Sequence, residues 1–371
     1  MEKRNISLLL CGDVMTGRGI DQILAHPSEP TLHESYVKDA TDYVHLAEVK
    51  NGPIPRHVPW NYIWGEALHE VRMNKPDAWI VNLETSITSS EQWLNKGINY
   101  RMHPDNVACL KKAGIDVCSL ANNHVLDWSL SGLQETVQCL HKADLKTCGA
   151  GANRNEASQP AILDFGDRGR VLVFSFATES SGVPIAWDAT AGGGGVNLLK
   201  TLDNAAIKNL KNHIQSYKHP RDLIVLSIHW GENWGYEVAP NEAWFARHLI
   251  DEAEVDVVYG HSSHHAKGFE IHNGKLILYG CGDFLNDYEG IGGYENFHPE
   301  LSVMYFIELD SETGKLAELK LVPLRLQKFQ LKKASRTEVS WINKTLNREG
   351  INLPRKIKIE PDLSLRLSIP H

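Results

Sequence analysis

The sequence is poor in cysteine, with six among 371 residues, and none of them forms a Cys-x-x-Cys pair. Scattered cysteines in a chain of this length argue against a disulfide framework. Most lie among apolar neighbours, as Cys11 does after Leu8-Leu9-Leu10, which is typical of small buried side chains. We therefore expect a protein of a reducing cytoplasm.

Long hydrophobic runs are also missing. The first apolar run covers only residues 6–11, which is shorter than the apolar region of a signal peptide. No other stretch approaches the roughly 18 apolar residues of a membrane span. The sequence thus predicts a soluble, cytoplasmic protein without a membrane span.

An excess of positive charge is absent as well, because 38 Lys and Arg face 46 Asp and Glu, giving a net charge of −8. This balance argues against nucleic acid as a partner. A composition of 42% apolar and 23% charged residues excludes a disordered chain or a fibre. What stands out is the count of 18 histidines, since histidine is the commonest metal ligand in proteins.

Short apolar runs alternate with amphipathic segments along most of the chain, a pattern that favours an α/β fold with buried sheets. Strands are predicted at residues 6–11, 78–83, 116–120, 171–176, 223–229, 255–259 and 276–279. Helices are predicted at residues 60–73, 104–113, 130–142, 202–217, 241–254 and 337–348.

Two segments interrupt this alternation. Residues 26–59 are rich in proline, histidine and charge, and are predicted to be an insertion after the first strand. Residues 327–371 combine a basic stretch, one helix and a strand-like end. We predict one large domain over residues 1–326, containing the insertion, followed by a C-terminal helix–strand extension over residues 327–371.

Polar side chains stand where the apolar runs end. Five successive strand ends carry Asp13, Glu84, Asn122-Asn123-His124, His229 and His261-Ser262-Ser263-His264. Ligands of open α/β sheets bind at the carboxyl ends of strands, so we expect these groups to meet. Carboxylate, amide and imidazole donors without thiolate suit Mn, Fe, Zn or Ca, and two neighbouring ions would need a shared carboxylate.

The ordered motifs resemble the CapA/PgsA family, the bacterial capsule or poly-γ-glutamate synthesis proteins of the calcineurin-like metallophosphoesterase superfamily. The resemblance covers roughly residues 5–325 and implies a four-layer α-β-β-α sandwich. It rests on Gly12-Asp13 with Arg18, Asn82-Leu83-Glu84, Ala121-Asn122-Asn123-His124 with Asp127, His229-Trp230-Gly231 and Gly260-His261-x-x-His264. Gly282-Asp283-Phe284 resembles the family's G-N-F strand end, with Asp in place of Asn.

This resemblance also implies roles for single residues. Two divalent ions would be held by Asp13 and His264, by Asn123 and His229, with Glu84 bridging and His261 completing the set. Proton transfer and charge stabilisation would fall to His124, oriented by Asp127, and to Arg18. One departure is clear, because the superfamily's D-x-H element is here Asp13-Val14-Met15 and one imidazole ligand is missing.

Residues beside these motifs are candidates for substrate contact. Trp230 and Trp234 flank His229 and could form an apolar wall for a peptide-like or aromatic substrate. Arg101 and His103 lie in the loop that follows Glu84 and could line the cleft. Most other histidines are expected at the surface.

Three functions compete at this point. The first is a metal-dependent hydrolase of a phosphoester or a γ-glutamyl-like peptide, with His124 as general acid or base. The second is a metal-assisted epimerase or isomerase that abstracts a Cα proton from a peptide. The third is a non-catalytic accessory factor in capsule or polyglutamate assembly. The sequence leaves open whether the chain forms a homo-oligomer.

Overall fold

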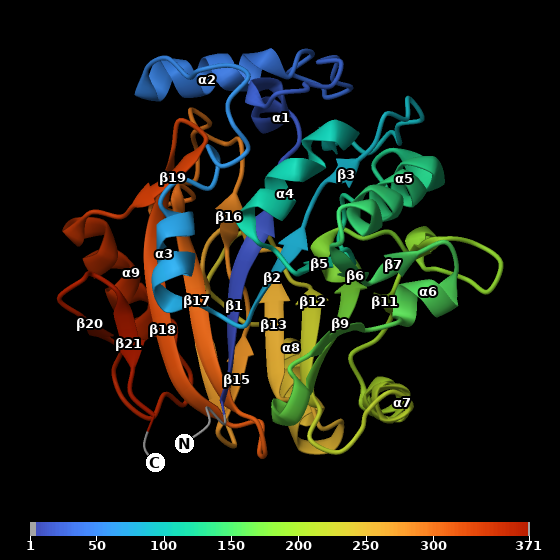
Figure 1. Ribbon diagram of the computed structural model, residues 1–371, viewed down its shortest axis with the longest axis vertical. Coiled ribbons are helices and arrows are strands. Elements are labelled where there is room, and N and C mark those ends of the chain that lie inside the picture. Colours follow the sequence, from blue (N-terminus) through green and yellow to red (C-terminus); the bar gives the residue numbers. More distant parts are fainter. Residues whose placement is uncertain (1–4, 370–371) are drawn as a thin grey trace.

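The structure is a computed structural model that describes residues 5–369. Positions 1–4 of the predicted domain and positions 370–371 of the predicted extension lie outside the described residues. Two large β-sheets form its centre (Figure 1). The first runs in the order β20 (Lys358–Ile359), β21 (Leu365–Leu367), β18 (Leu316–Gln327), β17 (Leu301–Asp310), β1 (Asn5–Val14), β2 (Ala78–Leu83), β5 (Val117–Ser119) and β6 (Lys146–Cys148). In addition, β16 (Asp283–Leu285) pairs with β1, and β19 (Gln330–Lys333) pairs with β18.

The second sheet runs in the order β11 (Leu198–Leu199), β9 (Arg170–Thr178), β12 (Leu223–His229), β13 (Val257–His261), β15 (Lys275–Leu278) and β14 (Phe269–His272), with β8 (Ala161–Asp164) on β9. Two small pairs join β7 (Ala150–Gly151) to β10 (Gly195–Val196), and β3 (Ser86–Ile87) to β4 (Arg101–Met102). The helices are α1 (Gly19–Ile23), α2 (Thr41–Asn51), α3 (Ala67–Asn74), α4 (Ala108–Ala113), α5 (Ser129–Lys142), α6 (Arg154–Ser158), α7 (Asn204–Gln215), α8 (Pro240–Glu252) and α9 (Arg336–Glu349).

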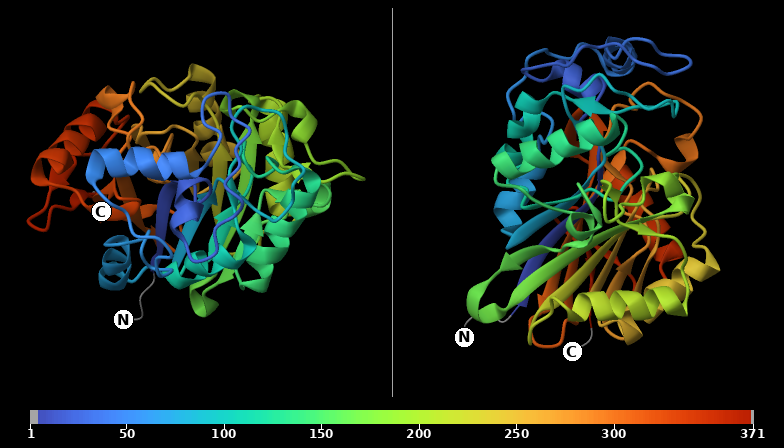
Figure 2. Two further views of the ribbon diagram at one scale, coloured as in Figure 1. Left: turned by 90° about the horizontal axis from the view of Figure 1, so that it is seen from above. Right: turned by 90° about the vertical axis from the view of Figure 1, so that its right-hand side faces the viewer.

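The period of two along each strand separates the core into layers. In β1, Leu8 and Leu10 face the second sheet, whereas Leu9 and Cys11 face the helices on the other side. A third cluster fills the outer face of the second sheet, under α7 and α8. The two sheets therefore pack face to face between two helical layers, as Figure 2 also shows, and the predicted four-layer α-β-β-α sandwich is confirmed.

All seven predicted strands are present, and five of the six predicted helical segments contain helix over most of their length. The segment 60–73 is helical only from Ala67, because turns occupy its first half. Within these turns Gly65 has a φ of +45°, and a Cβ atom there would lie 2.1 Å from the Leu331 carbonyl oxygen. The insertion 26–59, for which no helix was predicted, contains α2 and lies across the upper end of the molecule in Figure 1.

The C-terminal segment shares the core of the main fold. The predicted boundary between residues 326 and 327 falls one residue before the end of β18. Beyond it, β19 and β21 both pair with β18, and α9 buries Val339, Ile342 and Leu346 in the cluster between the sheets. The division of the chain into a domain over residues 1–326 and an extension over residues 327–371 stays a prediction.

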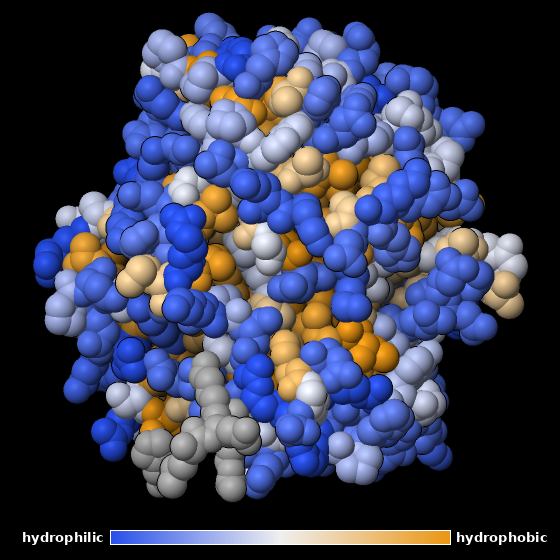
Figure 3. Space-filling model, viewed as in Figure 1, coloured by the Kyte–Doolittle hydropathy of each residue, from blue (hydrophilic) through white to orange (hydrophobic). Residues whose placement is uncertain are grey.

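Polar side chains cover most of the face shown in Figure 3, with apolar ones in small patches between them. Val49 and Met73 are among the exposed large apolar residues. Among residues 5–369, none of the helices has both the length and the apolar character that crossing a membrane requires.

Candidate metal centre

The predicted site residues meet between the two sheets, at the carboxyl ends of their parallel strands. In β2 the period of two puts Asn82 and then Glu84 on the inner face, in line with Ile80. In the facing sheet, the same period directs His229 and His261 inward from β12 and β13. This end of the sheets lies below α1 and α2 in Figure 1.

A bulge at the end of β1 turns Asp13 toward the same space. Leu10 is opposite Ile80, but the next paired residues are Asp13 and Asn82, so β1 holds one extra residue. Such a bulge re-aims the side chains that follow it. Asp13 Oδ1 accepts a hydrogen bond of 2.7 Å from the Asn82 amide, and Oδ2 accepts one of 3.1 Å from the Ser262 backbone N–H.

Close backbone packing brings a further carboxylate to the site. A Cβ atom on Gly12 would lie 1.5 Å from the Gly282 carbonyl oxygen, so only glycine fits there. This contact lets β16 pair with β1 so that Asp283 stands opposite Asp13. Asp283 was outside the predicted ligand set, although the Gly282-Asp283-Phe284 strand end marks its position in the sequence.

Three carboxylates are thus buried together: Asp13, Glu84 and Asp283. Burial and the charge of Asp283 raise the pKa of Asp13 to about 7. Burial and the charge of Asp13 raise the pKa of Glu84 well above its ordinary value. Buried like charges repel one another in a low-dielectric interior, so a divalent cation bound among them would relieve the repulsion.

Two imidazoles face these carboxylates. The Nδ1 atoms of His229 and His261 are 2.8 Å apart, and His261 Nε2 is 2.7 Å from the Ser227 hydroxyl. His229 Nε2 is 3.9 Å from a Glu84 carboxylate oxygen. Burial lowers the pKa of both rings, that of His261 to about 3, so both are neutral and can act as ligands.

The donor atoms fit a divalent ion. Asp13, His229 and His261 each offer a ligand atom, and these atoms all lie within 4.8 Å of one another. The buried atoms His229 Nε2 and Asn123 Oδ1 have no hydrogen-bond partner among residues 5–369. Buried polar atoms are rarely left unpaired, and imidazole, amide and carboxylate together suit Mn, Fe or Zn.

His264 is held by the additional carboxylate. Its Nδ1 is 2.9 and 3.1 Å from the two oxygens of Asp283, which also accepts a 2.8 Å hydrogen bond from the Asn286 amide. Burial lowers the pKa of His264 and Asp283 raises it, with a net rise. A carboxylate on one imidazole nitrogen orients the other nitrogen, as is usual for metal-binding histidines.

His124 and Asp127 form a hydrogen-bonded pair beside the carboxylates. His124 Nδ1 is 2.7 Å from Asp127 Oδ2, and its Nε2 is 3.9 Å from Glu84 Oε1. The same Asp127 oxygen accepts a 2.6 Å hydrogen bond from the Tyr100 backbone N–H. Burial lowers the pKa of His124 to about 4, so the ring is neutral near pH 7.

The Arg18 side chain forms ion pairs with two carboxylates of the chain itself. Its guanidinium is buried, pairs with Asp287 at 2.5 Å and with Glu34 at 2.9 Å, and lies over the rings of Tyr43 and Tyr100. Two carboxylates already balance its charge. These contacts join the 26–59 segment, through Glu34 and Tyr43, to Arg18, which lies shortly after the end of β1. Besides burial, the charge of Arg18 also acts to lower the pKa of His124 and His264, and its predicted role in charge stabilisation stays a prediction.

Three predicted substrate residues are not brought to the cluster. Trp230 follows the inward-facing His229, so the period of two turns it into the core under α8, where its indole N–H donates to the Tyr279 carbonyl. The Arg101 side chain is buried and contacts Glu91 and the Trp128 ring. His103 caps the short 3-10 helix Pro104–Val107.

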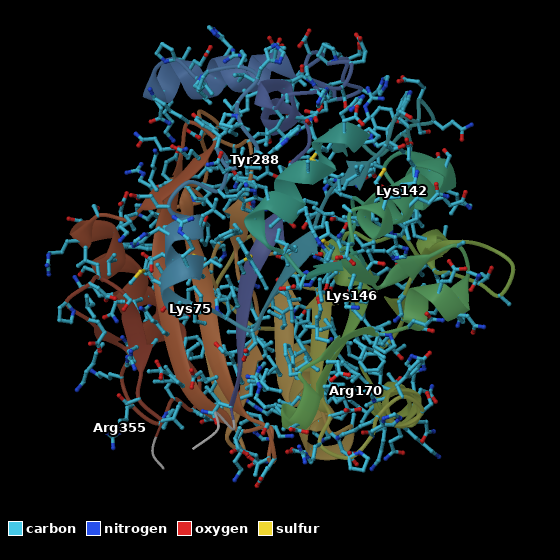
Figure 4. The ribbon with its side chains drawn as sticks, viewed as in Figure 1. Lys75, Lys142, Lys146, Arg170, Tyr288 and Arg355 are labelled. Carbon is cyan, nitrogen blue, oxygen red and sulfur yellow. The ribbon has the colours of Figure 1, made fainter. Side chains whose placement is uncertain are left out.

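Aromatic residues border His264. The Trp234 ring lies 5.3 Å from the His264 ring, but Tyr294 stacks on it at 3.9 Å and covers one face. Tyr288 lies edge-on to His264, and Figure 4 shows it in the upper part of the molecule, below α1 and α2. Its hydroxyl is 3.7 Å from the sulfur of Met15, the residue at the missing imidazole position.

The profile of the family described as "Bacterial capsule synthesis protein PGA_cap" matches residues 7–288. A probable polyglutamine synthesis accessory protein of Mycobacterium tuberculosis is 44% identical over 96% of this chain and 94% of its own length. Capsule biosynthesis protein CapA of Bacillus anthracis is 25% identical over 88% of this chain and 69% of its own length. A solved phosphatase structure from Mycoplasma pneumoniae aligns over 90% of this chain and 95% of its own, at 14% identity and a TM-score of 0.49.

Proposed function

Because this chain belongs to the PGA_cap family of bacterial capsule synthesis proteins, we propose that it is a metal-dependent hydrolase of a phosphoester or a γ-glutamyl-like peptide bond. One observation carries the proposal. The Glu84 carboxylate lies 3.9 Å from both the His124 and the His229 Nε2 atoms, and His229 Nε2 has no hydrogen-bond partner in the part of the chain that the structure describes. A ligand cluster and an acid–base group thus share one carboxylate.

The ions would be held by Asp13, Glu84, Asn123, His229, His261 and His264, with Asp283 orienting His264. When bound, such ions supply positive charge that polarises a phosphoryl or carbonyl oxygen and makes water nucleophilic near neutral pH. Six donors with one central carboxylate allow two ions, although Met15 removes one imidazole.

The residues of the chain supply the proton transfer. With Asp127 as the acceptor, His124 Nδ1–H donates a hydrogen bond to its carboxylate, which would leave Nε2 of the ring unprotonated. Neutral His124 can accept a proton at Nε2 and return it to a leaving group. Below the 26–59 segment, burial keeps bulk water away and strengthens these interactions.

Two other functions stay open to the same experiment. An unprotonated Nε2 could equally remove a Cα proton, which would make the protein an epimerase. The Mycobacterium relative carries the name of an accessory protein, and a metal site that only binds an acidic polymer would agree with that name.

The deciding assay supplies Mn²⁺, a phosphodiester and γ-glutamyl peptides in D₂O, and follows both cleavage and deuterium at Cα. We expect cleavage by the wild type and its loss in Glu84→Gln, with folding checked by circular dichroism. His45→Gln, an exposed substitution on α2, is the matched control and should cleave as the wild type does. Deuterium without cleavage would instead show an epimerase. Equal rates for wild type and Glu84→Gln would refute both catalytic functions.

A further inference from the structure

A lysine that the sequence motifs do not include contacts the His124–Asp127 pair. Lys96 lies in the loop between β3 and β4, and its ammonium donates to Asp127 Oδ1 at 2.7 Å. The same nitrogen is 3.2 Å from His124 Nδ1 and also donates to the Asn123 backbone carbonyl. The Lys96 side chain therefore contacts three residues of the candidate site: Asn123, His124 and Asp127.

The charge of Lys96 is placed where a buried carboxylate needs it. Asp127 is fully buried, and an ionised carboxylate without a cationic partner is costly in such a position. The Lys96 side chain is only 22% exposed, and its ammonium lies 5.3 Å from the Trp187 ring centre. The contact is thus largely shielded from solvent, which makes it stronger than an exposed ion pair.

The loop is anchored so that the lysine returns to this place. The Leu94 backbone N–H donates to the Asp127 carbonyl at 2.8 Å, and the Asn99 amide donates to the same carbonyl at 3.2 Å. Lys96 lies between these two anchors. A freely moving surface lysine would not be flanked by two hydrogen bonds, one from the Leu94 backbone and one from the Asn99 side chain, that both reach its ion-pair partner.

The hydrogen-bonding capacities of Lys96 and Asp127 determine which nitrogen of the His124 ring carries the proton. An ammonium can only donate hydrogen bonds and an ionised carboxylate can only accept them. Since Asp127 Oδ2 is 2.7 Å from His124 Nδ1 and Lys96 is 3.2 Å away, the shorter contact is the hydrogen bond, and Nδ1 carries the proton. The ion pair with Lys96 keeps Asp127 ionised and therefore a hydrogen-bond acceptor. The hydrogen bond to Asp127 in turn fixes the orientation of the His124 ring.

We propose that Lys96 is a positioning residue that acts through Asp127 to keep the His124 ring in one orientation and one tautomer, with Nε2 directed toward Glu84. The proposal extends the proposed function, on which its catalytic consequence rests. The arrangement of the three side chains itself can be tested without any turnover.

The first test measures the tautomer of His124. Full-length protein with ¹⁵N-labelled histidine is examined by long-range ¹H–¹⁵N NMR, with and without diamagnetic Zn²⁺, and His124 is assigned by loss of its signal in His124→Gln. We expect a single Nδ1–H state in the wild type and loss of that single state in Lys96→Met. An Nε2–H ring in the wild type, or an unchanged ring in Lys96→Met, would overturn the proposal.

The second test measures turnover with the substrate found in the assay above. We expect Lys96→Met to lower kcat about 10- to 100-fold, part of the 10²–10⁴ that a positioned acid–base group contributes, with KM within about twofold. Lys96→Met combined with Asp127→Asn should be no slower than Asp127→Asn alone, because both act on one ring. Lys111→Met, which removes an exposed ion pair with Asp144, is the control and should not change kcat.

The two tests separate two kinds of failure. If the wild type cleaves nothing, the proposed function fails, and the NMR result still decides whether Lys96 orders His124. If the wild type cleaves a substrate and Lys96→Met lowers kcat no more than Lys111→Met does, the proposed role of Lys96 is wrong. The proposed function stands in that case. Lys96→Arg, which keeps the charge, should recover part of kcat in a folded protein.

Discussion

At the scale of single residues, the site depends on buried polar atoms that have no hydrogen-bond partner among the described residues. These atoms are His229 Nε2 and Asn123 Oδ1, and they lie next to carboxylates whose charged form is disfavoured by burial. A chain gains no stability from such an arrangement alone. The arrangement is understandable if a cation binds there, and this is the basis of the account.

The first prediction concerns His124. Replacing it with Gln should lower kcat about 10²- to 10⁴-fold, because the group that moves the proton at Nε2 is lost. Metal content should not change, since His124 is outside the group Asp13, His229 and His261 whose ligand atoms lie close together, and is not one of the proposed ligands. Steady-state kinetics and elemental analysis of the same sample provide the measurement. A variant that loses its metal would show His124 to be a ligand instead.

The second prediction concerns pH. The pKa of Asp13 is raised from 3.8 to about 7 in the metal-free protein, so folded Asp13 keeps a proton that the unfolded chain releases above pH 4. The stability of the metal-free protein should therefore fall as pH rises from about 4 to 7. Ion binding must displace that proton, and the raised pKa of Glu84 favours a second one there, so affinity should rise at least tenfold per pH unit up to about 7.

Calorimetric titration with Mn²⁺ or Zn²⁺ between pH 5.5 and 8 measures this dependence. Asp13→Asn, which carries no titrating proton at this position, should bind more weakly and with a flatter pH profile. An affinity that is flat for the wild type across this range would contradict the raised pKa.

Much of the site could be predicted from single residues. The carboxyl ends of parallel strands meet at one edge of a sheet, and the polar residues that follow each apolar run can be identified in the sequence. Trp230 could have been excluded as well, since a residue next to the inward-facing His229 must face the other way. Arg18 and Lys96 could not be placed, because their partners Glu34 and Asp127 lie on other segments and no local pattern indicates such pairing.

At the scale of elements, the β1 strand decides where the site lies. Its bulge reverses the alternation just before Asp13, and without it this side chain would face the helices. The sequence of β1 contains no signal for the extra residue, apart from Gly12 itself. The sequence also did not predict helix α2, because its apolar residues do not fall on one clear face.

The third prediction tests the close approach of β1 and β16. Gly12→Ala should destabilise the protein by about 1–3 kcal/mol or more, because a Cβ atom would overlap the Gly282 carbonyl and push the strands apart. It should also weaken metal binding, since Asp13 and Asp283 are held by this pairing. Urea unfolding and metal titration measure the two effects.

Gly192→Ala is the matched control, because nothing lies within 4 Å of a Cβ atom there and its φ is not in the left-handed region. It should change the free energy of unfolding by less than about 0.5 kcal/mol. Equal stability of the two variants would show that the strands can separate at Gly12 without cost.

At the scale of the whole molecule, the C-terminal segment completes the core rather than lying on it. α9 buries Val339, Ile342 and Leu346 beside the second sheet, and Ile351 forms a bridge with Glu270 of β14. The buried Glu270 also binds Arg247 of α8. Sequence periodicity predicted α9, but the pairing between β18 and β21, whose partners are 44 to 48 residues apart, has no local signal.

The fourth prediction follows from this packing. Leu346→Ala should cost about 2–5 kcal/mol of unfolding free energy, the range for a large-to-small change in a core. Ile359→Ala on β20, where the side chain is 37% exposed, should cost less than about 1 kcal/mol. Denaturant unfolding of both variants decides the question. A Leu346→Ala protein as stable as Ile359→Ala would mean that the segment adds little to the core.

The central claim is that the buried cluster binds divalent metal, and the most direct test is a count of ions per chain. The wild type, His229→Ala and the surface control His45→Ala are loaded with Mn²⁺ or Zn²⁺, desalted and measured by elemental analysis. The account predicts at least one ion per chain in the wild type and in His45→Ala, and a marked loss in His229→Ala. A wild type that retains no more metal than His229→Ala would contradict it.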